Sequence, residues 1–281
     1  MRARIWGSRG TVATPGSETV RYGGNTSCVE VRLDDGAVLI LDGGTGLRAL
    51  GARLAEDPPP RIDLLITHLH VDHVEGLGVF EPIWRPETEL HIWGPPSPVT
   101  SLNERLAWYF SPPLFPVHLS EVPARTTFHD TPDGEWSVNG ATLFSTPIRH
   151  PGPTVGYRLE ADGRVLAYLT DHEPAFGGED ALELPPEWIS GYAVAAQADV
   201  LFHDCQYTEQ EYAGRIGYGH SASAHAARFA EIAEVGRLVL FHHDPMHPDD
   251  ELDRIRERVL ERWPVDPERV VLATEGSTVE V

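Results

Sequence analysis

Three histidines and one aspartate occupy six consecutive positions of the segment THLHVDHVEG: His68, His70, Asp72 and His73. The mostly apolar run Ile62–Thr67 comes directly before them and predicts a buried strand. Side chains two apart in an extended segment point the same way, so His68 and His70 can reach one point in space. Asp72 and His73 follow where the chain turns, and they can address a second point nearby. Burying such groups costs free energy unless each has a partner, and divalent metal ions would partner all four.

Three other predicted strands end in residues of the same kinds. His150 follows in TPIRHP, Asp171 in LAYLTDHE, and the pair His242 and His243 in LVLFHHDP. Taken singly, each has an ordinary role as a loop residue, a turn former or a surface residue. Strand ends can converge on one edge of a sheet, and together with the first motif these residues make the ligand set of two divalent ions sharing a bridging carboxylate. Imidazole-rich ligands favour zinc, with manganese and iron as alternatives.

Short strands and helices alternate along the chain and would position these residues. The pattern predicts strands over Ala3–Trp6, Ser27–Leu33, Ala37–Leu41, Ile62–Thr67, Leu90–Trp93, Ala141–Ser145, Thr154–Leu159, Val165–Leu169, Val200–His203, Leu238–Phe241 and Val270–Ala273. It predicts helices over Gly46–Ala55, Val74–Phe80, Pro98–Trp108, Trp188–Ala196, Ala222–Val235 and Asp249–Arg262. No repeat or long linker divides the 281 residues, so we expect an α/β fold of mixed sheets covered by helices in one domain, residues 1–281.

Charge and composition narrow the possible partners. The formal net charge is -21, and all 22 basic residues are arginine. A chain this acidic is repelled by nucleic acid unless it has a local basic patch, and no run of adjacent arginines occurs. Without lysine, Schiff-base chemistry and a Walker A loop are excluded.

The chain lacks the features of a membrane or secreted protein. No stretch approaches the ~20 apolar residues that cross a bilayer, and the start MRARIWGSRG lacks the apolar segment of a signal peptide. We therefore expect a cytoplasmic protein without a membrane partner. Cys28 and Cys205 are interpreted as buried free thiols, with a ligand role for Cys205, in LFHDCQ, as the lesser alternative.

The order of motifs resembles the metallo-β-lactamase superfamily, in the branch of ribonuclease Z and small phosphodiesterases. The resemblance covers nearly the whole chain, and the ligand motif is its most specific part. The other motifs are GSRGT, RYGGNTSC, LDGGTGLRAL, HIWGPP, TDHE, LFHDCQ, GHSASAHAA, LVLFHHDP and VVLATEG. The resemblance implies an αββα four-layer sandwich with two metals at one edge, between the sheets.

The resemblance also implies a ligand for each position. One metal is expected on His68, His70 and His150, the other on Asp72, His73 and His242, with Asp171 between them. His242 is preferred to His243 because the family's ligand follows the strand immediately; His243 is left to support a ligand or contact substrate. Asp42 resembles an aspartate that orients a ligand imidazole, and a turn before Gly43 is its alternative role.

Two close cations lower the pKa of a shared water, so that a bridging hydroxide can attack the substrate, and Asp72 is counted as catalytic as well as a ligand. His220 in GYGHSAS resembles the histidine of the His-Ser-Thr motif of ribonuclease Z, which donates a proton to the leaving group. The threonine is missing here, and Asp204 stands where the family tends to have glutamate. Asp204 would hold and charge the imidazole. A turn before a helix and a helix cap are the alternative roles of the two residues.

We expect a small-molecule phosphodiester as substrate, of the cyclic nucleotide or cyclic ribosyl phosphate type. Lactone, thioester or β-lactam hydrolysis, a ribonuclease Z-like endoribonuclease and a non-catalytic metal-binding sensor are the alternatives. Ribonuclease Z enzymes grip transfer RNA with a Gly- and basic-rich arm, whereas Leu106–Leu119 (LAWYFSPPLFPVHL) contains no arginine. We therefore expect no nucleic-acid partner.

The stretch Leu106–Leu119 is open to three interpretations. It is a packed loop, a contact of a homodimer, or a lid in which Tyr109, Phe110 and Phe115 stack on a substrate ring; packing or self-association is preferred. The remaining histidines have no assigned role. His225 is expected on a solvated helix face, His172 and His203 adjoin candidate ligands, and four have no companion at ligand spacing: His91, His118, His129 and His247.

Overall fold

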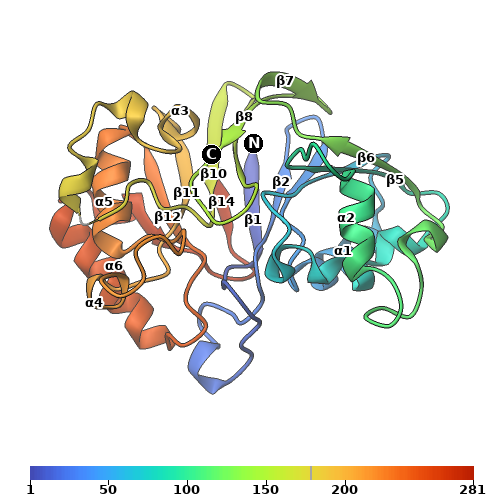
Figure 1. Ribbon diagram of the computed structural model, residues 1–281, viewed down its shortest axis with the longest axis horizontal. Coiled ribbons are helices and arrows are strands. Elements are labelled where there is room, and N and C mark those ends of the chain that lie inside the picture. The colour runs from blue at the N-terminus through green and yellow to red at the C-terminus, as the bar shows by residue number, and fades with distance from the viewer. Residues whose placement is uncertain (178) are drawn as a thin grey trace.

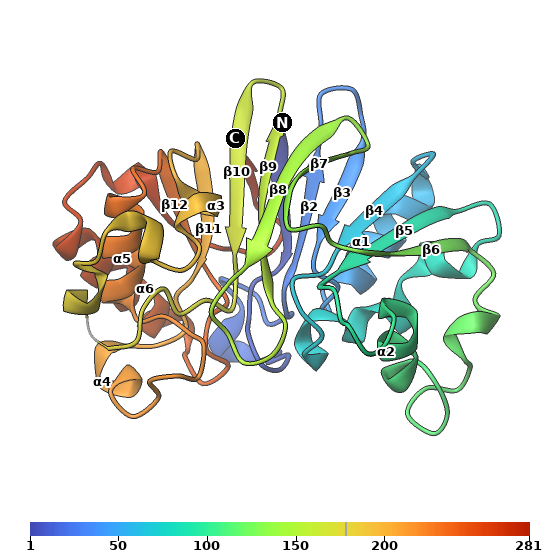
Figure 2. The ribbon, with the colours of Figure 1, turned by 45° about the horizontal axis from the view of Figure 1, so that its top comes forward.

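The computed structural model describes residues 1–177 and 179–281. Two seven-stranded mixed sheets lie face to face, and helices cover both outer sides (Figures 1 and 2). The order of the first sheet is β14-β1-β2-β3-β4-β5-β6, and that of the second is β13-β12-β11-β10-β9-β8-β7. The expected αββα sandwich is confirmed.

The first sheet consists of β1 (Arg2–Gly7), β2 (Cys28–Arg32), β3 (Val38–Leu41), β4 (Ile62–Leu65), β5 (Glu89–Gly94), β6 (Arg125–Asp130) and β14 (Thr278–Glu280). The second consists of β7 (Gly134–Val138), β8 (Ala141–Pro147), β9 (Val155–Ala161), β10 (Arg164–Leu169), β11 (Val200–Asp204), β12 (Arg237–Phe241) and β13 (Val270–Leu272). The α-helices are α1 (Leu47–Glu56), α2 (Leu102–Tyr109), α3 (Tyr192–Ala195), α4 (Glu209–Tyr212), α5 (Ser223–Ile232) and α6 (Asp249–Arg262).

Burial follows the alternation of side chains along the strands. In β1, Ala3 and Ile5 are fully buried between the sheets, whereas Arg2 and Arg4 face outward and are exposed. The four residues of β3 and those of β4 are all buried, because α1 covers the outer side of the sheet at these strands. Apolar burial therefore specifies both the register of the strands and the side on which the helices pack.

The central strands bring the predicted site residues to one edge. Strands β3 to β6 run parallel to one another, as do β10 to β13. The carboxyl ends of parallel strands meet at the same edge, so the loops that follow β4, β10 and β12 leave the sheets together. These are the loops that carry THLHVDH, TDHE and FHHDP.

The structure corrects several predicted elements. Strands β6, β7 and β14 were not predicted, because each carries too few apolar residues to alternate clearly. The predicted helix Val74–Phe80 is instead a 3₁₀ turn over Glu75–Val79, preceded by another over Val71–His73. Its two glycines disfavour an α-helix, and Gly76 packs so closely on the backbone of Gly44 that a Cβ there would lie 2.0 Å from the carbonyl oxygen.

The helix predicted over Trp188–Ala196 is likewise short, because only Tyr192–Ala195 is α-helical. Gly191 directly before it has φ 75°, in the left-handed region, which interrupts the helix. Cys28 and Cys205 are both buried free thiols, as predicted. Within the two described ranges, no helix combines the length and the apolar character that crossing a membrane requires.

Candidate metal centre

Seven side chains from loops of both sheets form two groups that share one member. Group A consists of His68, His70, His150 and Asp171, and group B of Asp72, His73, His242 and Asp171. In each group, one nitrogen or oxygen atom per residue lies within 4.8 Å of those of the others. The structure therefore brings together the residues that the sequence predicted as ligands, in the predicted division.

In group A, ring nitrogens face one another. His68 Nε2 lies 2.9 Å and His150 Nε2 lies 3.2 Å from His70 Nδ1. His68 is buried, whereas His70 is exposed, so this group opens to solvent. Burial lowers the pKa of His68 far below its usual value and that of His150 to about 4. Both rings are therefore neutral near pH 7 and keep a lone pair for a ligand bond.

In group B, imidazoles and carboxylates face one another. Nε2 of His242 lies 3.3 Å from Asp72 Oδ2, and Nε2 of His73 lies 3.3 Å from the same atom. Burial favours neutral His73, but the nearby carboxylates, Asp171 first, outweigh it and raise its pKa well above the usual value. The carboxylates of Asp72 and Asp171 thus favour a positive charge within group B.

Asp171 lies between the groups with one oxygen directed at each. Its Oδ1 lies 3.5 Å from His68 Nε2 and 3.8 Å from His150 Nε2. Its Oδ2 lies 3.1 Å from Nε2 of both His73 and His242. This is the arrangement of a carboxylate that bridges two cations.

The outward ring nitrogens of three ligand candidates are held by protein acceptors. His73 Nδ1 donates to Asp42 Oδ2 (2.9 Å) and His242 Nδ1 to Gln206 Oε1 (3.1 Å). His150 Nδ1 donates to the carbonyl oxygen of Gly219 (3.0 Å). Each bond keeps a proton on Nδ1, so Nε2 faces the group and is the nitrogen that would bind a metal ion in place of a proton, as in many metal sites.

The donor set fits divalent ions. Nε2 of His73 is buried and has no hydrogen-bond partner among the residues that the structure describes, and carboxylate oxygens of Asp171 and Asp72 lie 3.1 Å and 3.3 Å from it. An orphaned buried nitrogen is costly unless something else coordinates it. A metal ion would satisfy that lone pair and the facing nitrogens of group A at once.

His220 and Asp204 form a pair beside both groups. His220 Nδ1 donates to Asp204 Oδ2 at 2.7 Å. The other oxygen of Asp204 accepts from the backbone N–H of Ser221 (2.8 Å), so the carboxylate is fixed. The His220 ring centroid lies 5.1 Å from those of both His150 and His242. Asp204 therefore reaches His220 despite its short side chain, and Nε2 of His220 forms no hydrogen bond within the part of the chain that the structure describes.

A family model described as the β-lactamase superfamily domain matches residues 38–243. The chain belongs to this superfamily. A ribonuclease Z from Mycobacterium sp. (strain KMS) is 27% identical over 238 residues, covering 78% of either chain. Among solved structures, a diphosphatase of the PhnP family has a TM-score of 0.70 at 18% identity, with 100% of this chain and 97% of that one covered. Human tRNase Z, short form, has a TM-score of 0.65 at 18% identity, covering 100% and 99%.

Three site residues of this superfamily member have left-handed backbone conformations without being glycine. The φ angles are 59° at Asp42, 49° at Asp171 and 58° at His242. Such conformations cost about 1–3 kcal/mol each and persist only where the surroundings impose them. Each residue directly follows a strand or lies just beyond its end, so the sharp turn aims the side chain at the metal centre.

Asp42 is an orienting residue in addition to forming a turn. It is fully buried, and besides His73 it accepts from the backbone N–H (2.8 Å) and the hydroxyl of Thr67 and from the hydroxyl of Tyr168 (3.1 Å). Four donors hold the carboxylate in place. The interpretation that it orients a ligand imidazole therefore fits the geometry.

Glu173 is a buried residue of the site that the sequence did not reveal. It accepts from the hydroxyl of Tyr212 (2.7 Å) and from the backbone N–H groups of Gly217 (2.9 Å) and Gly219 (3.0 Å). Gly219 in turn accepts from His150, so Glu173 fixes the loop that orients a ligand candidate. The Gly-x-Gly turn before His220 was the one feature of the sequence that could have indicated a loop with backbone N–H groups in need of an acceptor.

The turn GSRGT also contributes, by two contacts. The backbone N–H of Thr11 donates to Asp72 Oδ2 at 2.7 Å. Gly10 lies against the His242 ring, where a Cβ would approach Cε1 to 2.3 Å. Only glycine leaves room for the ring at this position.

Other histidines lie outside the two groups. His243 packs beside Tyr22 and donates from Nε2 to the carbonyl oxygen of Ala273 (3.3 Å), so it faces away from the metal centre. His172 and His203 contact each other at 3.0 Å. His225 was expected on a solvated face, but it is buried and bonded to the carbonyl oxygen of Gly177 (2.8 Å).

His91 and His129 were expected to lack companions, but their ring nitrogens lie 2.8 Å apart across the β5–β6 pair. His247 likewise has a partner, since its Nε2 lies 3.0 Å from a carboxylate oxygen of Glu211.

Only part of the stretch Leu106–Leu119 packs against the core: Leu106, Phe110 and Leu119 are buried, whereas Trp108 and Leu114 are exposed. Phe110 is 1% exposed, and its ring lies 4.2 Å from that of Phe115. Tyr109 donates to the carbonyl oxygen of Glu75 (3.2 Å). The ring of Phe110 is buried in the core, so the lid interpretation is wrong for it, whereas Phe115 is half-buried and its role in a lid stays a prediction. Self-association through this stretch stays a prediction.

Proposed function

We propose that this superfamily member is a hydrolase of small phosphodiesters that uses two divalent metal ions. The observation that carries the proposal is the position of Asp171, with one oxygen directed at group A and the other at group B. A shared carboxylate of this kind is typical of two-metal sites that cleave phosphate esters. The substrates we expect are cyclic nucleotides or cyclic ribosyl phosphates.

Group A would hold one ion through His68, His70 and His150, and group B the other through Asp72, His73 and His242. The imidazole donors favour zinc, and the two carboxylates also suit manganese or iron. Two bound ions supply Lewis acidity and a water of lowered pKa. Asp42, Gln206 and the Gly219 carbonyl hold the rings so that little reorganisation is needed when ions bind.

His220 is the proposed proton donor to the leaving group. Asp204 accepts from Nδ1 and so fixes the ring with Nε2 on the side away from Asp204. The ring lies next to His150 and His242 and is therefore within reach of a substrate bound between the groups. An alkoxide leaving group needs such a donor because its conjugate acid has a high pKa.

This pair bears on the choice among substrates of the same fold. A thioester expels a thiolate, which needs protonation less, whereas a lactone, like a phosphodiester, expels an alkoxide. A non-catalytic sensor would have no use for a second histidine fixed by a buried aspartate. We rank phosphodiester hydrolysis above lactone, thioester or β-lactam hydrolysis because relatives named ribonuclease Z match the chain, and above a sensor role because every expected ligand position holds a residue that can bind a metal.

Endoribonuclease activity on transfer RNA is the second candidate, favoured by the similarity to proteins named ribonuclease Z. Against it stand the net charge of -21, the absence of lysine and the lack of arginine in Leu106–Leu119. Phosphate contacts by basic residues supply most of the affinity of nucleic-acid binding. A small phosphodiester has one phosphate group and does not require an extended basic surface.

The proposal is tested with a panel of substrates and purified protein supplied with zinc or manganese. The panel contains an aryl phosphodiester, cyclic nucleotides, a lactone and a thioester. We expect turnover of the phosphodiesters, abolished by Asp72→Ala or His150→Ala and retained by His118→Ala, which changes an exposed histidine outside both groups. Hydrolysis of the lactone without the phosphodiesters would reverse the ranking.

A further inference from the structure

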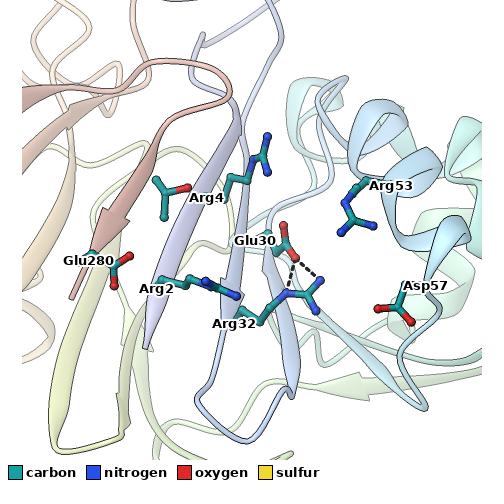
Figure 3. A pocket seen from close by; sticks show the side chains of 8 residues that line it. Arg2, Arg4, Glu30, Arg32, Arg53, Asp57 and Glu280 are labelled. Carbon is teal, nitrogen blue, oxygen red and sulfur yellow. Dashed lines mark hydrogen bonds and ion pairs between the residues drawn. The ribbon is translucent and has the colours of Figure 1, made fainter.

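A pocket lies on the outer face of the first sheet (Figure 3), and no residue of group A or group B lines it. It is an open cavity of about 520 Å³ between the strands β14, β1 and β2 and the helix α1, within the range of ~300–1,000 Å³ usual for small-molecule sites. Its lining, named here the arginine pocket, consists of Arg2, Arg4, Glu30, Arg32, Arg53, Asp57, Thr278 and Glu280.

Strand register concentrates positive charge in the arginine pocket. Arg2 and Arg4 alternate with the buried Ala3 and Ile5, so both extend from the same outer face of β1. Arg2 is paired directly with Arg32 on β2. Like charges directly opposite each other destabilise a sheet, and a bound anion would relieve this repulsion.

The guanidinium groups of Arg2 and Arg4 have no carboxylate partner. Arg32 bonds to Glu30 (2.7 Å), whose other oxygen accepts from the indole N–H of Trp6. Within residues 1–177 and 179–281, by contrast, neither Arg2 nor Arg4 forms an ion pair or a side-chain hydrogen bond. In a chain with twice as many acidic as basic residues, two adjacent unpaired arginines indicate that their partner comes from outside.

Other groups complete the pocket. The guanidinium of Arg4 lies 4.6 Å from the ring centroid of Trp6, which supports it. Figure 3 shows Arg53 extending from α1 toward the strands, on the opposite side of the cavity. Its ion pair with Glu56 is long, at 3.4 Å, and solvent-exposed, so it contributes little and leaves the group available.

Two carboxylates in the pocket oppose anion binding. Glu280 is directly opposite Arg2 in register, and Asp57 follows the end of α1, but neither forms an ion pair among the described residues. Glu30 is already neutralised by Arg32. Three guanidinium groups, those of Arg2, Arg4 and Arg53, therefore face two free carboxylates, so the pocket is locally cationic on a strongly acidic molecule.

We propose that the arginine pocket binds the phosphoryl group of a small phosphorylated molecule. Guanidinium groups match phosphate oxygens with paired, charge-assisted hydrogen bonds and are weakly hydrated, so desolvating them costs little. Thr278, which is opposite Arg4 on β14, adds a neutral hydroxyl donor to the lining. This proposal does not depend on the reaction at the metal centre.

The test is calorimetric titration of the metal-loaded protein with inorganic phosphate at low ionic strength. We expect a binding event that Arg2→Gln or Arg4→Gln weakens by about tenfold or more, the usual loss for a charged hydrogen bond. Arg48→Gln is the matched control, since it removes an exposed arginine of α1 that does not line the pocket. His150→Ala removes phosphate binding at the metal centre and leaves the pocket event in place.

Glu280→Gln supplies a change of opposite sign. Removing this carboxylate should tighten phosphate binding several-fold, whereas Glu18→Gln, an exposed change elsewhere, should leave it unaltered. Phosphate binding that is identical in wild type, Arg4→Gln and Glu280→Gln would overturn the proposal. An equal loss in Arg48→Gln would also overturn it, because net charge alone would then explain the binding.

Discussion

Asp171 is the residue on which both halves of the metal centre depend, because each of its oxygens faces one group. We predict that Asp171→Asn lowers the metal content from two ions to one or fewer and slows phosphodiester hydrolysis at least 100-fold, on the order of the loss when a catalytic electrostatic partner is removed. Elemental analysis and steady-state rates on one preparation measure both. Asp133→Asn, an exposed change, is the control; two ions and full activity in Asp171→Asn would contradict a bridging role.

His220 is a single residue proposed to act in another step, the protonation of the leaving group. We predict that His220→Ala slows turnover by a factor of ~10² to 10⁴ on substrates with poor leaving groups, with metal content unchanged. The loss should be much smaller with nitrophenolate, which leaves without a proton. Equal losses on both kinds of substrate, or a matching loss of metal, would exclude proton donation.

At the scale of elements, the loop before α5 is held by Glu173 through Gly217 and Gly219. We predict that Glu173→Gln lowers the free energy of unfolding by about 1–3 kcal/mol, since at least one buried N–H loses its charged acceptor. It should also weaken the metal bound through His150, whose tautomer depends on Gly219. Denaturant unfolding and metal titration measure these effects, with the exposed Glu187→Gln as control. Unchanged stability and metal affinity in Glu173→Gln would show that the loop keeps its conformation without the Glu173 carboxylate.

The segment from α2 to Leu119 is predicted to serve packing. Phe110→Ala should cost about 3–5 kcal/mol of stability, as is usual for a large buried aromatic side chain. Leu114→Ala, at a side chain that is 71% exposed, should change it by less than about 0.5 kcal/mol. Hydrolysis per folded molecule should be the same in both variants. A loss of turnover without loss of stability in Phe110→Ala would restore the lid interpretation.

The sequence was most informative where an apolar strand is followed directly by histidine or aspartate. The strands that precede His68, Asp171 and His242 are buried, nearly continuous apolar runs, so their ends, and hence the loops, could be located. Strands β6, β7 and β14 escaped prediction because they are short or lie at sheet edges, where polar residues are tolerated and alternation weakens. Where the alternation of apolar and polar residues is this weak, pairing with the neighbouring strand determines whether the segment forms a strand.

The supporting residues of the site could be predicted less well than the ligand candidates. His225 falls in an alanine-rich helix with no obvious polar partner in sequence, yet it is buried because the loop at Gly177 covers it. Glu173 and its glycine partners are more than 40 residues apart, and nothing in the sequence pairs them. Contacts of this kind depend on the packing of the loops, which local patterns do not encode.

At the scale of the whole molecule, net charge distinguishes hydrolysis of small phosphodiesters from endoribonuclease activity on transfer RNA. We predict no salt-dependent binding of precursor transfer RNA near physiological ionic strength, because binding requires many cationic contacts and the chain carries a net charge of -21. Filter binding over a salt series measures this, alongside hydrolysis of a small phosphodiester. Tight, steeply salt-dependent binding with cleavage at the 3′ trailer would make the endoribonuclease the leading candidate.

The central claim, two metal ions acting together on a small phosphodiester, is tested most directly by activity as a function of metal added. Protein freed of metal by chelation is titrated with zinc, and hydrolysis of bis(p-nitrophenyl) phosphate is measured at each addition. If groups A and B each hold one ion with Asp171 between them, the rate should rise to a plateau at two equivalents per chain. A plateau at one equivalent, or full hydrolysis by the metal-free protein, would contradict it.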